Sequence, residues 1–197
     1  MAVKITQSRN ISFGLGALYL FLALPAVRTS LEAVMAVHML VQIPLLTAIG
    51  IIACRLLPIH WQDSLLDAMG GAIPCVLLAI FASSYWMLPR AMDAALANPL
   101  AEVAKFISLP VLVGLPLSLA WKQLSAIGRG FVLTNFISMM SMLGWLYIEA
   151  PVRVCNYYLV NQQTDAGWMM VKISILLIVG WMGSLFCGGD PMKPGSD

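Results

Sequence analysis

The sequence predicts an all-α, polytopic integral membrane protein with about six transmembrane helices and one short interfacial helix. Hydrophobic residues make up 60% of the 197 residues, only 10% are charged, and the mean hydropathy is +0.88. Soluble domains carry about 25% charged residues, so this composition excludes a soluble globular fold. Apolar runs long enough to cross a bilayer recur along the chain, since about 20 apolar residues suffice. We expect a single domain over residues 1–197, with spans at about 11–27, 31–57, 70–88, 103–121, 131–148 and 168–187.

The first span follows a short basic segment that contains Lys4 and Arg9. This segment resembles the start of a signal peptide, but no small-residue cleavage site follows, so we expect the helix to be retained. Arg28 and Thr29 form a very short link to the next span. The link predicts that the first two spans are an antiparallel pair.

The second span is the most informative, because it carries Glu32, His38 and Gln42 within an apolar run. His38 and Gln42 are four residues apart and therefore share one helix face. Polar groups inside a membrane are costly unless they face protein or water, so this face is predicted to point inward. Two interpretations stay open: the pair only bonds to neighbouring helices, or it forms part of a site.

Between the second and fourth spans, residues 55–67 are predicted to be a polar loop, and residues 89–105 are too polar to cross a membrane. A short interfacial helix is expected from Pro89, broken before Pro99. At the start of the fourth span, Glu102 and Lys105 are spaced to form an ion pair at the interface.

Residues 122–129 are predicted to be a basic loop, and the fifth span follows with a methionine cluster at its centre. Methionine sulfur is a soft Cu(I) ligand, and methionine also packs well in any helix, so both roles are considered. Residues 149–167 are read as a loop before the sixth span, where Lys172 is expected to extend toward the interface.

Basic residues near the span ends favour a cytoplasmic N-terminus, and six spans then place both termini in the cytoplasm. Under this orientation Cys155 should be reachable from the periplasm. The nearly balanced charge, with 11 basic and 9 acidic residues, argues against a nucleic-acid partner. The four cysteines are scattered without metal-ligand spacing, and no nucleophile lies beside a base, so we expect no enzyme activity.

Three segments together resemble the CtaG family of cytochrome oxidase assembly factors. HMLVQIPLLTAIG (38–50) resembles the family's HMVQHLLL…PPLL…G segment, and YWMLPRAMDAALANPLAEVAKF (85–106) is similar to its WHLP…DAAL…HP…H…H segment. LVNQQTDAGWMMV (159–171) is similar to its DQQ…GLIMWVPG segment. The three segments occur in the family's order and span most of residues 38–171.

The resemblance implies a polytopic protein of the bacterial inner membrane that helps place copper in heme-copper oxidases. Only His38 matches a family histidine; the other positions hold Gln42, Met87, Glu102 and Phe106. Copper sites need several nitrogen or sulfur donors, so no tightly bound cofactor is expected, with copper as the open alternative. The metal candidates are His38 and Met87, supplemented by Met35, Met39 and Glu102.

The polar segments on the predicted periplasmic side suggest a docking face, because Tyr, Trp and Arg often anchor interfaces. The candidates are Trp86, Arg90, Asp93, Tyr157, Tyr158 and Gln162. The amides at residues 161–163, just before a span, need partners, so the loop at residues 149–167 is expected to be tied to the second span or to residues 85–105.

Three function classes follow: an assembly factor for a copper-dependent respiratory enzyme, an accessory subunit of another large membrane complex without copper chemistry, and a small transporter. The absence of an inverted repeat in the sequence ranks the transporter last. The expected partners are membrane lipid and a larger respiratory or copper-enzyme complex.

Overall fold

In the computed structural model, which describes residues 2–187, the chain folds into helices joined by short links. The elements are α1 (Ala2–Ala23), α2 (Pro25–Glu32), α3 (Met35–Val37), η1 (His38–Gln42), α4 (Ile43–Leu56), α5 (Ile59–Ala68), α6 (Ala72–Met87), α7 (Pro89–Ala97), α8 (Pro99–Ser108), η2 (Leu109–Gly114), α9 (Leu115–Trp121), α10 (Ala126–Glu149) and α11 (Val160–Cys187).

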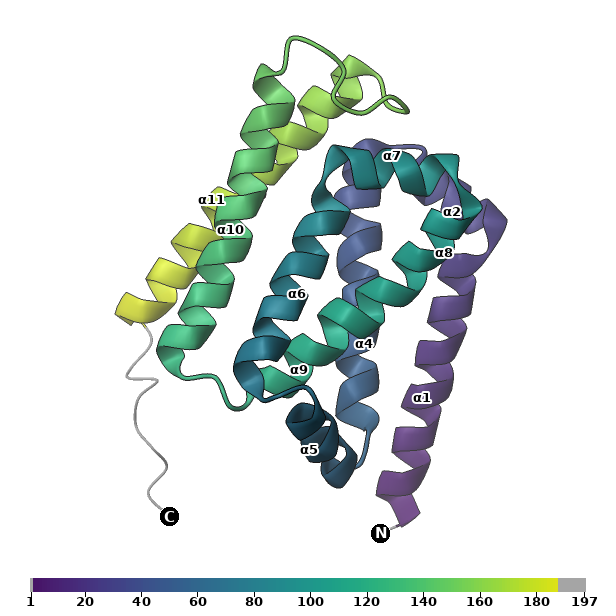
Figure 1. Ribbon diagram of the computed structural model, residues 1–197, viewed down its shortest axis with the longest axis vertical. Helices are drawn as coiled ribbons and strands as arrows, with labels where there is room; N and C mark the ends of the chain where they lie inside the picture. The colour runs from purple at the N-terminus through teal and green to yellow at the C-terminus, as the bar shows by residue number, and fades with distance from the viewer. Residues whose placement is uncertain (1, 188–197) are drawn as a thin grey trace.

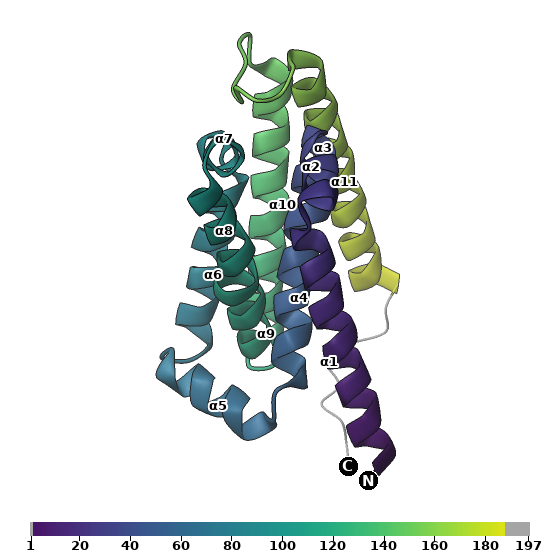
Figure 2. The same cartoon turned by 90° about the vertical axis from the view of Figure 1, so that its right-hand side faces the viewer.

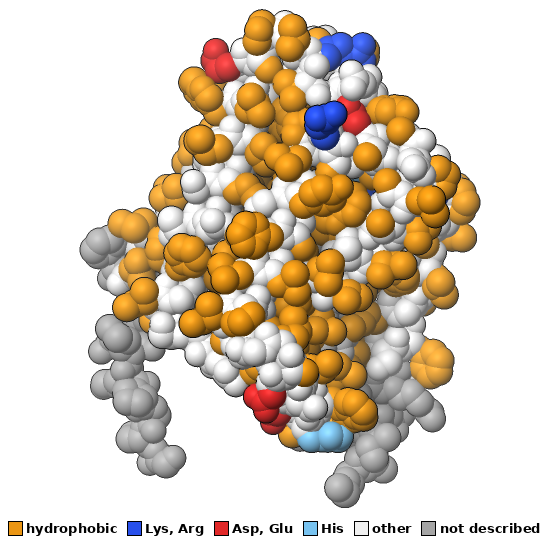
Figure 3. All heavy atoms as spheres, in the orientation of Figure 1, with side chains coloured by type: hydrophobic (Ala, Val, Ile, Leu, Met, Phe, Trp, Pro, Cys, Tyr) orange, Lys and Arg blue, Asp and Glu red, His pale blue; other side chains and the backbone are white. Residues whose placement is uncertain are grey.

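Four helical runs of the described chain are long and apolar enough to cross a membrane: Met35–Leu56, Pro99–Trp121, Ala126–Glu149 and Val160–Leu185. Two bent pairs raise the number to six if each pair counts as one span; α1 and α2 meet at 68°, and α5 and α6 at 79°. Apolar side chains cover the middle of the face in Figure 3, whereas acidic and basic groups lie mainly toward its two ends. The all-helical class is therefore confirmed, and the length and composition of its helices are those of a membrane-embedded protein.

The long helices run side by side, and short helices cross their ends (Figure 1). Helices α1, α4 and α6 lie beside the run from α8 to α9, while α2 and α7 cross one end and α5 crosses the other. Helices α10 and α11 pack along each other as a hairpin at one side (Figures 1 and 2). The predicted antiparallel pairing of the first two spans is confirmed, since α1 packs against α4 and runs in the opposite direction.

Several predicted boundaries are wrong, and prolines explain two of them. Arg28 and Thr29 do not form a link; they lie in α2, which starts at Pro25 because proline is well suited to a first helical position. The second long helix begins at Met35 rather than residue 31, after an extended Val34. The predicted polar loop at 55–67 largely forms α5, which follows Pro58.

In the second half of the chain both predicted loops are shorter than expected, because the helices after them start earlier. Helix α10 starts at Ala126, which leaves a link of residues 122–125, and α11 starts at Val160 rather than at Trp168. The short helix predicted from Pro89 is confirmed as α7, and Asn98 then caps α8 by accepting a hydrogen bond from the Leu100 N–H.

Two π-helical turns, η1 and η2, interrupt the long helices. In each turn a backbone N–H bonds five residues back: Ile43 to the carbonyl of His38, and Leu115 to that of Pro110. Pro44 and Pro110 cannot donate backbone hydrogen bonds, so the regular ladder is interrupted near both turns. The wider turn at η1 buries His38, Met39 and Gln42 together, and π turns occur often at functional sites.

Glycines set the closest helix contacts. A Cβ added to Gly50 in α4 would lie 2.7 Å from the Cα of Pro110, and one added to Gly114 would lie 2.8 Å from the Cα of Gly50. Only residues without a side chain allow two helix backbones to approach this closely, as is common in membrane proteins. This contact fixes η2 against α4, and it therefore fixes α8 relative to the polar residues of η1.

Candidate functional site

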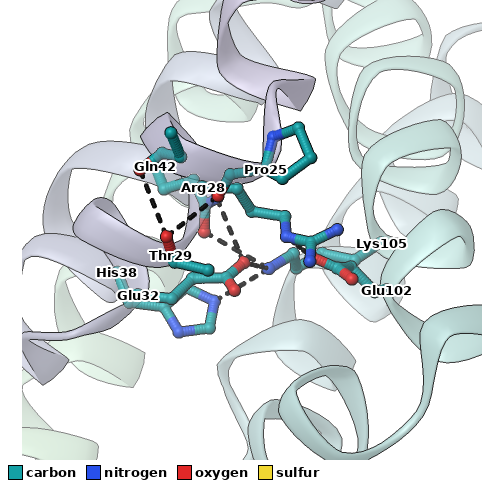
Figure 4. A network of polar contacts seen from close by, with 9 residues as sticks. Pro25, Arg28, Thr29, Glu32, His38, Gln42, Glu102 and Lys105 are labelled. Carbon is teal, nitrogen blue, oxygen red and sulfur yellow. Dashed lines mark hydrogen bonds and ion pairs between the residues drawn. The ribbon is translucent and has the colours of Figure 1, made fainter.

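The candidate site is a buried group of polar side chains that we name the Lys105 cluster. Its members come from α2, from η1 and from α8 (Figure 4), and from the loop before α11. They are Arg28, Glu32, His38, Gln42, Glu102, Lys105 and Tyr158. The predicted inward orientation of His38 and Gln42 is confirmed, because both are fully buried.

Lys105 lies at the centre of the cluster, and only 1% of its surface is exposed. Its Nζ is 2.6 Å from Oε1 of Glu32, 3.1 Å from Nε2 of His38 and 3.2 Å from Oε1 of Gln42. An ammonium group has three protons to donate, and three acceptors surround it here. Buried charges need this kind of complete pairing, since an unpaired ion in a low-dielectric interior is very unfavourable.

The hydrogen bonds also assign the protonation of His38. The hydroxyl of Tyr158 donates its proton to the carbonyl of Glu32, at 2.8 Å. The contact of 2.8 Å between Nδ1 of His38 and that hydroxyl therefore needs a proton on Nδ1. Nε2 is then the unprotonated nitrogen, which accepts from Lys105. Both ring nitrogens are thus occupied within the protein.

A second ion pair extends the cluster toward the surface. Nε of Arg28 lies 2.5 Å from Oε1 of Glu102, whereas Lys105 pairs with Glu32. The predicted pairing of Glu102 with Lys105 is therefore wrong. The two residues lie on the same helix, but α2 brings a closer opposite charge to each of them. The four charges, two positive and two negative, cancel.

The loop before α11 is tied to the rest of the protein at two points. Tyr158 belongs to the Lys105 cluster. Its burial, together with the nearby Glu32, raises the pKa of its phenol, so the hydroxyl stays protonated. Asn156 donates through its backbone and side chain to Asp93 of α7, at 2.8 and 3.0 Å to Oδ2. The expected ties to the second span and to residues 85–105 are confirmed. They are made by Tyr158 and Asn156.

The amides at the start of α11 have a different role from the predicted one. Gln163 is buried, and its Oε1 accepts from the backbone N–H of Val154 while its Nε2 donates to the carbonyl of Tyr147. Gln163 therefore joins the Val154 end of the loop to the start of α11 and to α10, and it makes no contact of this kind with the second span. Arg153 adds to this by donating to the carbonyls of Asn156 and Tyr158.

The predicted docking residues do not form one exposed surface. Trp86 and Tyr158 are buried, at 5% and 3% exposure, and Nε1 of Trp86 donates to the hydroxyl of Ser108. Their assignment as docking anchors is wrong for this arrangement, because both bond within the protein. Asp93 holds the loop, whereas Arg90 and Tyr157 are exposed and Gln162 is partly exposed.

Cys155 is also internal, which corrects the expectation that it is reachable from outside. It is fully buried, and burial together with the nearby Asp93 raises the pKa of its thiol to about 11. Its place in the loop gives it no access to solvent, because the loop packs onto the protein.

The copper ligands suggested by the sequence are close to the cluster but do not fit a copper ion in this arrangement. Met35, Met39 and Met87 are buried in the same apolar core, and Glu102 is committed to Arg28. His38 offers no free nitrogen, and an ammonium already lies beside its Nε2. In the described part of the chain no group of three or more His, Cys, Asp or Glu side chains could hold a metal. A copper site at His38 and Met87 stays a prediction that requires Lys105 to move.

Sequence reasoning missed Arg28 and Lys105 as members of the site. The sequence places Arg28 in a predicted link and Lys105 at the predicted interface. A signal was present: an ionisable residue inside an apolar span is a functional candidate, and the buried Glu32 requires a cation. The sequence did not show which of the nearby cations supplies it.

Comparisons of the chain with protein-family models, with curated proteins and with solved structures found no match.

Proposed function

We propose that this protein is a non-catalytic membrane component that acts in the assembly or structure of a copper-dependent respiratory enzyme, such as a heme-copper oxidase. The enzyme class comes from the three segments that resemble the CtaG family. The role as a protein scaffold, in place of a copper carrier, comes from the Lys105 cluster.

The observation that carries the proposal is the position of the Lys105 ammonium. It lies among a histidine nitrogen, a carboxylate oxygen and an amide oxygen, at 2.6–3.2 Å. These atoms resemble the donors of a cation site, yet the cation is a side chain of the same protein. A tethered ammonium satisfies the donors permanently and repels a metal ion, so the site favours structural integrity over metal exchange.

The same observation favours a second candidate, an accessory subunit of another large membrane complex without copper chemistry. The two candidate functions differ in the complex that the protein joins. Neither of them includes a role in metal transfer. The identity of the complex recovered with the protein separates them.

The test is purification of the full-length protein from its native membrane in mild detergent, with partner identification and metal analysis. We expect a respiratory or copper-containing enzyme at fixed stoichiometry, and well under one equivalent of Cu(I) on the separated subunit. Recovery with an unrelated complex would support the second candidate. Stoichiometric Cu(I) that is lost in His38→Ala and kept in the control His60→Ala would overturn both and restore a copper-carrier role.

A further inference from the structure

Helix α11 is the least covered of the candidate membrane spans. Only 11% of its most apolar window is buried within the protein, compared with 44% for Met35–Leu56 and for Pro99–Trp121. Helix α10 covers one side of it, and α3 contacts it near one end. No other helix of the described chain covers its remaining faces to a similar extent, and α11 lies at the outside of the bundle (Figures 1 and 2).

One cation lies on this open side. Lys172 is exposed, and it shares its helix face with residues three, four and seven positions away, which are exposed as well. These neighbours are Asp165, Trp168, Met169, Ile175, Leu176 and Val179. We name this set, with Lys172, the Lys172 face. It is an apolar surface with one cation inside it.

Lys172 has no carboxylate partner within the described part of the chain. The ion pairs found there are Arg28–Glu102 and Lys105–Glu32, both in the Lys105 cluster. The nearest acidic residue on its own face is Asp165, seven residues earlier, or about 10 Å along the helix. That separation is too long for a direct ion pair.

A lysine without a protein partner can instead extend its side chain so that the ammonium reaches the membrane surface, and the side chain tilts toward the helix N-terminus. The stem covers about one helical turn, whereas the polar residue Asp165 lies about two turns away. Trp168 and Met169 occupy the intervening turn and are themselves exposed at 48% and 49%. A lone cation at this depth is unfavourable in lipid, and ionisable residues inside spans are normally paired.

We propose that the Lys172 face is the docking surface for a transmembrane helix of another protein, and that this helix carries an Asp or Glu at the depth of Lys172. The inference rests on the proposed role as a component of a larger membrane complex and names the chemistry of the contact. A second copy of this chain does not fit. Its Glu32 and Glu102 are already paired inside the fold. Its exposed Glu149 and Asp165 lie at or near the helix ends, and in a copy inserted in the same orientation Asp165 would lie about 10 Å from the depth of Lys172.

The test is site-specific photo-crosslinking of the full-length protein in its native membrane. A photoreactive amino acid replaces Leu176, which is 70% exposed and one turn from Lys172, and the crosslinked peptide is identified by mass spectrometry. We expect an adduct with an apolar helix of another protein that contains an acidic residue. The adduct should fall at least tenfold in Lys172→Met and be retained in Lys172→Arg. Exchanging the charges, with Lys172→Glu and the partner acid changed to Lys, should restore it.

A matched control places the same photoreactive group at Ile73 of α6. Ile73 is 72% exposed, close to the 70% of Leu176, but it lies outside the Lys172 face. Adducts to lipid alone, to a second copy of this chain, or to a helix without an acidic residue would each overturn the inference. So would an adduct that Lys172→Met leaves unchanged in a protein of unaltered melting temperature. If the identified partner belongs to no copper-dependent or respiratory enzyme, the proposed function fails while the docking surface stands.

Discussion

At the residue scale, the Lys105 cluster shows how a polar group is accommodated in an apolar bundle. Lys105 donates to Glu32, His38 and Gln42, and Gln42 donates in turn to Glu32 at 3.2 Å. Each added hydrogen bond offsets part of the cost of burying the two charges. A buried ion pair of this kind contributes little net stability compared with apolar packing. Removing only one of its two partners, however, leaves the other as an uncompensated buried ion. The cluster therefore specifies how α2, η1 and α8 are placed.

Removing the cation alone should be strongly destabilising. In Lys105→Met, Glu32 keeps a buried charge without a partner, and the free energy of unfolding in detergent should fall by about 3–5 kcal/mol. Chemical unfolding followed by circular dichroism measures this. The double variant Lys105→Met with Glu32→Gln removes both charges and should recover much of the loss. An effect below about 1 kcal/mol in the single variant would contradict the proposed pairing.

Tyr158 offers a test of the assigned histidine tautomer. Tyr158→Phe removes the hydroxyl that donates to the Glu32 carbonyl and accepts from Nδ1 of His38. Leaving these buried groups unsatisfied should lower the free energy of unfolding by about 1–3 kcal/mol. Tyr157→Phe is the matched control, because Tyr157 is 55% exposed and its loss should be nearly neutral. Equal melting temperatures for the two variants would argue against the assignment.

At the element scale, pairs of glycines decide how closely the helices approach. Gly50 and Gly114 meet where α4 crosses η2, and Gly144 and Gly167 meet where α10 crosses α11. A Cβ on Gly144 would lie 2.9 Å from the carbonyl oxygen of Gly167, and one on Gly167 would lie 2.7 Å from that of Gly144. Backbone cannot move aside as a flexible side chain can. These two crossings therefore fix the hairpin and the central helices.

A single methyl group at the first crossing should separate the helices. Gly50→Ala places its Cβ against the backbone of Pro110, and we expect a loss of about 1–3 kcal/mol or more in the free energy of unfolding. Gly14→Ala in α1 is the control, because nothing lies within 4 Å of its Cβ and alanine favours a helix. Thermal melting of both variants in the same detergent makes the comparison. A neutral Gly50→Ala would mean that the crossing is looser than described.

At the scale of the whole molecule, the start of α1 and the end of α11 both lie toward the same end of the bundle (Figure 1). The Lys105 cluster, to which α2 contributes, and the loop before α11 lie toward the opposite end, where α7 crosses the bundle. This arrangement fits an even number of crossings. It separates the polar core from the side that carries the start of α1 and the end of α11.

The common side of the ends can be measured directly. Reporter domains fused at residue 1 and after residue 197 should report the same compartment, and the basic residues predict the cytoplasm. Fusion points on opposite sides of the membrane would exclude the six-span arrangement. Fusion points that are both periplasmic would keep the span count and invert the orientation.

Cys155 provides a second measurement at this scale, since its thiol is buried and its pKa is raised to about 11. A maleimide should label it slowly in the folded protein and quickly after unfolding. Unfolding returns the thiol to a lower pKa, so the unfolded chain loses the proton first as the pH rises. This group's contribution to stability should therefore decrease between about pH 9 and pH 11, and Cys155→Ala should lack that part of the slope. Fast labelling of the folded protein at neutral pH would place the loop in solvent.

Local sequence patterns are enough to predict the helical class, the approximate positions of the long helices, the separate helix from Pro89 and the inward orientation of His38 and Gln42. Each follows from local chemistry: apolar length, proline at a helix start, and the 3.6-residue period. Only the tertiary structure decided which charges pair. Lys105 pairs with Glu32 and not with the predicted Glu102, because α2 folds across the bundle end and brings Glu32 and Arg28 close to α8, although Arg28 and Lys105 are 77 residues apart in the chain. The tertiary structure also places Trp86, Cys155 and Tyr158 inside the protein, since the burial of a helix face or of a loop depends on partners that are distant in sequence.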